Sequence, residues 1–170
     1  MTPDFVSATD PIDSLGEVLL RYLDYFRGVV IEKVQGLDDE TLRTSSLPSG
    51  WTPLELVKHL AYVELRWFVW GFEGEHIDDP WGDNRDGHWY VGPDESRELL
   101  VERLQLQGES TRRVVESHEL TDVGAPGERW DGDDPAELER VLLHVLQEYA
   151  RHAGHLDIVR ELIDGAVGES

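Results

Sequence analysis

Four long stretches of the chain carry apolar residues at three- and four-residue spacing, and this period is the strongest constraint on its fold. They cover residues 12–35, 51–72, 93–119 and 135–164 of the 170-residue sequence. Each is long enough for a helix with one buried face, and no stretch shows the two-residue alternation typical of strands. The pattern predicts an all-α fold: a four-helix bundle that forms one domain over residues 1–170.

A long segment without helical periodicity, residues 73–92, separates the second stretch from the third. It leaves room for a crossover connection. A segment of this length in a compact domain is usually functional or disordered, and the tryptophans Trp81 and Trp89 argue against disorder. Both are expected either to shape the mouth of a substrate site or simply to pack.

The chain is strongly acidic, with 36 acidic and 15 basic residues and a formal net charge of -21. Such a surface repels phosphate, which argues against nucleic acid and against anionic membranes as partners. No apolar run reaches the roughly 20 residues needed to span a bilayer, and the first six residues do not begin a signal peptide. The expected location is the cytoplasm.

The sequence contains no cysteine. This excludes disulfides, iron–sulfur clusters and a cysteine nucleophile from the chain. Any metal must therefore be held by nitrogen and oxygen ligands.

A carboxylate and two imidazoles share one face of the last predicted helix. Glu148, His152 and His155 stand at i, i+4 and i+7, so their lone pairs can point at a common spot. A divalent metal such as zinc needs such donors, but one helix rarely completes its coordination. His59, on the apolar face of the second predicted helix, is the candidate for a further ligand, because bundles build metal sites from facing helices.

Each of these residues also has an interpretation without a metal. His59 would then be a hydrogen-bonded core histidine, and Glu148 a helix-surface residue paired with Arg151 or His152. Together they favour a cation more strongly, because a buried carboxylate without a partner is costly. Spacing alone leaves both interpretations open, and the His-Glu-x-x-His pattern of metalloproteases is absent.

Two segments resemble the DinB/YfiT-like superfamily. Residues 49–60 (SGWTPLELVKHL) resemble its second helix, and residues 142–157 (LLHVLQEYARHAGHLD) its fourth, in the branch that includes mycothiol-dependent enzymes. The resemblance implies a four-helix bundle that carries a divalent metal on three side chains, here His59, Glu148 and His152. This set is similar to the zinc site of mycothiol-dependent maleylpyruvate isomerases, and nickel is the alternative metal.

The same resemblance implies a thiol S-transferase. Mycothiol or a related low-molecular-weight thiol would lose its proton at the open position of the metal and attack an electrophile. His155 stands where many members have glutamine, so the resemblance makes it a neighbour of the metal ligands rather than a ligand. Glu64 is also expected to be such a neighbour. No residue is assigned as acid or base. The expected role is in detoxification or stress, as a homodimer. A metal-dependent hydrolase or isomerase, and a binding bundle without activity, are the alternatives.

Overall fold

The computed structural model describes residues 5–12 and 14–168. Asp13, which falls in the first predicted helix, and the first four residues of the segment considered for a signal peptide lie outside the described residues. Within the described residues, no helix combines the length and the apolar character needed to cross a membrane.

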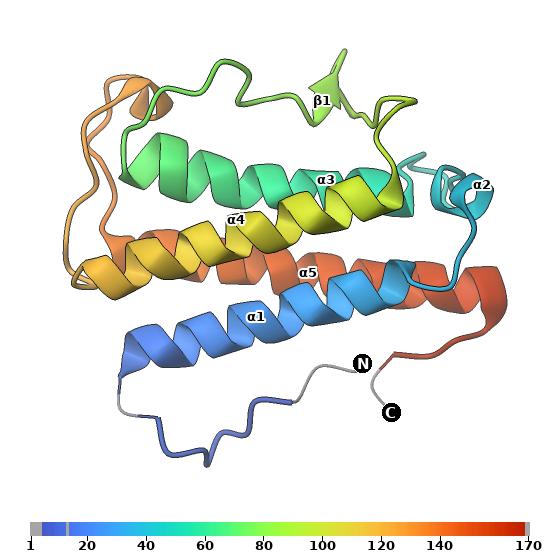
Figure 1. Ribbon diagram of the computed structural model, residues 1–170, viewed down its shortest axis with the longest axis horizontal. Coiled ribbons are helices and arrows are strands. Elements are labelled where there is room, and N and C mark those ends of the chain that lie inside the picture. The colour runs from blue at the N-terminus through green and yellow to red at the C-terminus, as the bar shows by residue number, and fades with distance from the viewer. Residues whose placement is uncertain (1–4, 13, 169–170) are drawn as a thin grey trace.

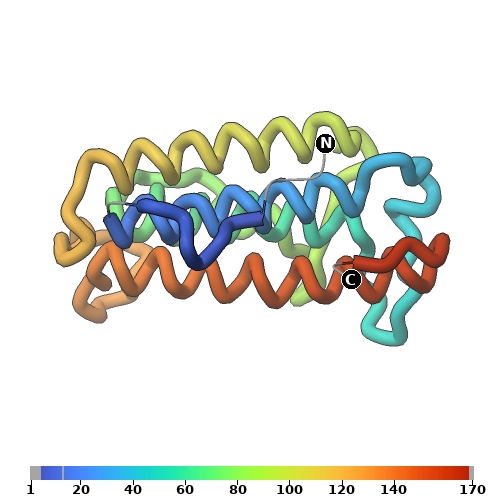
Figure 2. The backbone as a smooth tube through the Cα atoms, turned by 90° about the horizontal axis from the view of Figure 1, so that it is seen from below, coloured from blue at the N-terminus to red at the C-terminus, as the bar shows by residue number. Residues whose placement is uncertain are grey.

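Four long helices form the bundle (Figure 1): α1 (Leu15–Val34), α3 (Pro53–Glu64) extended by the π-helix η1 (Leu65–Phe72), α4 (Arg97–Ser117) and α5 (Leu138–Asp164). Two short helices, α2 (Asp39–Leu42) and η2 (Glu128–Trp130), lie in the connections. α1 and α5 run in one direction and α3 and α4 in the other; Figure 2 shows α1 between α4 and α5. The predicted all-α four-helix bundle is confirmed.

The connection from η1 to α4 returns along α3, which makes α3 and α4 parallel neighbours (Figure 1). This is the crossover for which the long segment left room. The segment is not wholly irregular, because β1 (Asn84–Arg85) pairs antiparallel with β2 (His88–Trp89). Asp86 and Gly87 form the turn with φ values of 54° and 80°, the conformation for which Asp-Gly is favoured in two-residue hairpins. The expectation of no strand was wrong here, and this dipeptide was the signal.

Side-chain caps and extended flanks decide where the helices begin. α3 starts with a capping box formed by Thr52 and Glu55. The last two long helices were predicted to begin at residues 93 and 135, but α4 begins at Arg97 and α5 at Leu138. The residues before α5 are extended because Glu137 pairs with Val123 in an antiparallel bridge, and the Leu138 amide donates to the Asp122 carbonyl at 2.9 Å.

A buried polar network ties the four long helices together. Glu64, at the end of α3, is fully buried and accepts two hydrogen bonds from Arg27 of α1, at 3.1 and 2.9 Å. It also accepts from Thr111 of α4 and from Tyr149 of α5. Burial, and then the neighbouring Glu64, raise the pKa of Tyr149, so its phenol remains a donor. A carboxylate in a core needs such partners, because a buried charge is costly without them.

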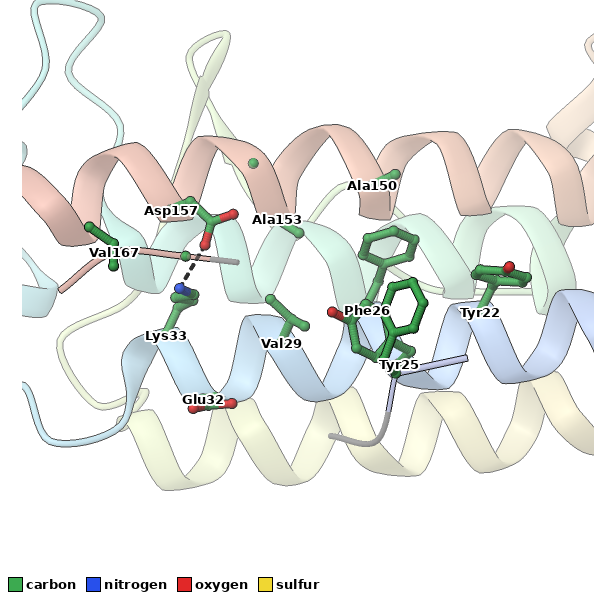
Figure 3. A pocket seen from close by; sticks show the side chains of 13 residues that line it. Tyr22, Tyr25, Phe26, Val29, Glu32, Lys33, Ala150, Ala153, Asp157 and Val167 are labelled. Atoms are coloured by element: carbon green, nitrogen blue, oxygen red, sulfur yellow. Dashed lines mark ion pairs between the residues drawn. The ribbon is translucent and has the colours of Figure 1, made fainter. Parts of the chain in front are cut away.

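A hollow of about 350 Å³ lies between α1 and α5. Aromatic side chains of α1 face small residues of α5 across it, and the ion pair of Lys33 with Asp157, 2.7 Å long, joins the two helices at one end (Figure 3). On α5, the lining positions Ala150, Ala153 and Asp157 face away from positions 148 and 152. The hollow is therefore separate from the group of residues described next.

Candidate metal centre

Three side chains singled out by the sequence analysis meet between α3 and α5. His59 comes from α3 and Glu148 and His152 from α5, and one donor atom of each lies within 4.8 Å of the other two. Glu148 Oε2 is 3.3 Å from His152 Nε2, and the ring centres of His59 and His152 are 5.3 Å apart. Donors that bind one zinc ion at roughly 2.0–2.2 Å need a spacing close to this, so the set fits a divalent metal.

His59 is oriented by a buried carboxylate from the crossover connection. Its Nδ1–H donates to Asp83 Oδ2 at 2.9 Å, which leaves Nε2 free to bind a metal. Asp83 is 2% exposed and is held in turn by Arg66 of η1, at 2.6 and 3.1 Å. Burial opposes ionisation, but the hydrogen bonds from His59 and Arg66 lower the pKa of Asp83 below its usual range. The sequence analysis missed Asp83, and its only signal was its place in a segment expected to be functional.

His152 presents one ring nitrogen to Glu148 and the other to His155. Its Nε2 faces the Glu148 carboxylate, whereas its Nδ1 is 3.3 Å from Nδ1 of His155. Burial, and then the charge of the neighbouring His59, lower the pKa of His152 to about 4. The imidazole is therefore neutral near pH 7, which is the form that binds metals. His155 contacts the far side of this ring and is not part of the group of three.

Two tryptophans form an aromatic wall beside the group. Trp89 of β2 stacks on His59 with ring centres 4.2 Å apart, and its ring centre is 5.3 Å from that of His152. Trp51, just before α3, is 6.1 Å from Trp89 and 6.2 Å from His155. A hollow of about 450 Å³ lies beside these two tryptophans. Small molecules therefore have space next to the wall.

Glu64 was expected beside the metal ligands, and Trp81 was expected either to shape the mouth of a substrate site or simply to pack; the contacts of both lie outside the group of three. The hydrogen bonds of Glu64 go to the core network, and its five-residue offset from His59 turns the two side chains to different sides of the helix. Trp81 is half exposed and packs against an arginine of η1 at 4.4 Å. His144, in contrast, borders the group, since its Nε2 is 3.9 Å from Glu148 Oε1.

Comparisons with known proteins agree with this architecture. A crystal structure described as a conserved protein from Enterococcus faecalis superposes with a TM-score of 0.62 and 15% identity, covering 91% of this chain and 100% of that chain. This likeness supports the fold. No curated protein matches the sequence. A family model described as mycothiol-S-transferase matches residues 18–165, a range that contains all three grouped residues. The chain therefore belongs to the mycothiol-S-transferase family.

Proposed function

We propose that this protein is a divalent-metal-dependent S-transferase for mycothiol or a related low-molecular-weight thiol. The observation that carries the proposal is the meeting of His59, Glu148 and His152 in a chain of this family. The chain has no cysteine, so the nucleophilic sulfur has to come from a cosubstrate. The proposed location is the cytoplasm.

The three side chains supply a suitable set of donors. His59 and His152 would bind the ion through Nε2, and Glu148 through its carboxylate. Three protein ligands leave a coordination position open, as in catalytic zinc sites. When bound, the ion would lower the pKa of a thiol at that position. We propose zinc, with nickel as the alternative, because imidazole suits both metals.

The remaining residues prepare the site rather than react. Asp83 fixes the tautomer and the ring orientation of His59, as outer carboxylates do for metal-bound histidines. Glu148 brings a negative charge that offsets part of the charge of a divalent ion. Trp89 covers the histidine rings on one side, which limits the access of water to them. The thiol and the electrophile would enter beside Trp51 and Trp89.

A conjugation assay tests the proposed activity. Zinc-loaded protein without a histidine tag is mixed with mycothiol and monobromobimane, and the conjugate is measured against the uncatalysed reaction. We expect acceleration that requires the metal and that falls at least about a hundredfold in Glu148→Gln, because this variant removes the anionic ligand. Glutathione and bacillithiol, assayed in parallel, identify the preferred thiol. A loaded protein that accelerates none of these reactions would contradict the proposal and favour the hydrolase or isomerase.

Asp83→Asn is expected to weaken zinc binding by roughly 10–100-fold, the usual cost of losing an outer-shell carboxylate. The amide cannot accept the His59 Nδ1–H as strongly, so the ring is less well oriented. The measurement is a competition titration against a chelator of known affinity. Asp78→Asn is the matched control, because Asp78 is an exposed residue of the same connection. Equal zinc affinities of the two variants would show that Asp83 does not support His59.

A further inference from the structure

Arg129, in η2, is a cation without a counter-charge. The protein carries a net charge of -21, and the loop around Arg129 contains Glu128, Asp131 and Asp133. Even so, Arg129 forms no ion pair with any carboxylate among residues 5–12 and 14–168, and Glu128 lies 3.7 Å from a histidine instead. The Nε of Arg129 is buried and has no acceptor in the part of the chain that the structure describes.

Two tryptophan rings lie beside this cation. The Arg129 guanidinium lies 4.4 Å from the ring centre of Trp67 and 5.9 Å from that of Trp70. Trp70 Nε1 is also buried without an acceptor among the described residues. Burial, and then the nearby charge of Arg66, lower the pKa of Arg129. Two buried N–H donors without protein acceptors are costly, and both are available to donate to a bound molecule.

The cluster adjoins the candidate metal centre through one ring. Trp67 contacts Arg129 and also His144, with ring centres 4.2 Å apart. His144 Nε2 is in turn 3.9 Å from the carboxylate of Glu148. Arg129 is therefore linked to Glu148 through only two intervening side chains, Trp67 and His144.

We propose that Arg129, with Trp70 beside it, forms an anion subsite that binds a carboxylate of the electrophilic substrate. The inference rests on the proposed S-transferase function. A guanidinium binds a carboxylate through charge-assisted hydrogen bonds. One guanidinium balances one negative charge, whereas a dianionic phosphate would leave excess charge in a protein that is already strongly acidic. The subsite would hold the acid group while the electrophilic carbon lies at the metal centre.

Benzoate binding tests the subsite without catalysis. Zinc-loaded wild type, Arg129→Met and the control Arg113→Met are titrated calorimetrically with benzoate and with neutral benzamide at constant ionic strength. Arg113 is a suitable control because it is exposed on α4. We expect benzoate, but not benzamide, to bind the wild type and the control, and Arg129→Met to bind it at least about tenfold more weakly. Arg129→Lys, which keeps the charge but loses the planar fork, is expected to fall between the two and replaces the methionine variant if that variant does not fold.

Two results would overturn the subsite. One is benzoate binding that is unchanged in Arg129→Met, whether or not the melting temperature of that variant falls. The other is binding that persists in Arg129→Met but disappears when the zinc is removed, because the carboxylate would then bind the metal. Either result would leave Arg129 as a residue that only packs on Trp67.

A pair of electrophiles separates this inference from the proposed function. The substrates are 4-(chloromethyl)benzoate and 4-(chloromethyl)benzamide. In each, the thiol sulfur forms the new C–S bond, chloride leaves with its bonding electrons, and the thiol proton passes to the buffer. We expect Arg129→Met to lower kcat/KM for the acid about tenfold and to leave that for the amide unchanged. If the wild type converts neither these two substrates nor monobromobimane, the S-transferase proposal fails, and the benzoate titration still decides whether the anion subsite exists.

Discussion

His152→Ala is expected to abolish stoichiometric metal binding. The variant removes one of three proposed ligands, so the loss should exceed the roughly 10–100-fold that the removal of an outer-shell partner costs. The measurement is elemental mass spectrometry on protein without a histidine tag, loaded with zinc or nickel and then desalted. We expect about one metal per wild-type chain, a weakened but measurable affinity for Glu148→Gln, and none for the double variant His59→Ala/His152→Ala.

His155→Ala is the matched control for this experiment, because His155 contacts the opposite ring nitrogen of His152. It should retain the metal. A His155→Ala protein that loses its metal while Glu148→Gln keeps it would overturn the ligand assignment. A wild type that retains neither zinc nor nickel would favour the binding bundle without activity.

Glu64→Ala is expected to lower the free energy of unfolding by about 3–5 kcal/mol, because it leaves the buried Arg27 without its main counter-charge. For a chain of this size the melting temperature should fall by roughly 6–20 °C. Thermal and urea unfolding followed by circular dichroism measure both quantities. The metal content of the folded variant should not change, because the hydrogen bonds of Glu64 go to the core network.

Two further variants make this prediction specific. Glu102→Ala removes an exposed glutamate of α4 and should change stability by less than about 0.5 kcal/mol. The double variant Arg27→Met/Glu64→Leu should recover part of the loss, because it removes the unpaired buried arginine, whereas the hydroxyls of Thr111 and Tyr149 still lack their acceptor. If Glu64→Ala is as stable as Glu102→Ala, the network contributes little. If Glu64→Ala is as stable as the wild type but binds no metal, Glu64 supports the metal centre.

Helical periodicity was sufficient to predict the bundle, because each long helix buries a continuous apolar face. The ends of the helices were harder to predict. The start of α5 depends on the bridge between Glu137 and Val123, a contact between segments that have no helical pattern. The π-helical extension of α3 was not predicted either, since the apolar residues of η1 fit an α-helix equally well.

The candidate site could be predicted where its residues share a helix. Glu148 and His152 are one turn apart, so their proximity follows from helix geometry, and His59 was singled out by its apolar surroundings. Asp83 could not be found in this way, because its position depends on how the crossover connection folds back over α3. Arg129 was missed for a similar reason, since its isolation from carboxylates is a property of the folded chain.

Gly108 lies in the middle of α4, where a glycine weakens a helix by roughly 1 kcal/mol relative to alanine. The structure gives the reason: a Cβ at this position would lie 2.5 Å from Cζ of Arg27. The guanidinium of Arg27, which donates to Glu64, thus packs directly against the backbone of α4 at Gly108. If α4 slid along its axis, a position with a side chain would meet the guanidinium. The close approach at Gly108 therefore favours the observed axial alignment of α1 and α4, at the expense of local helix stability.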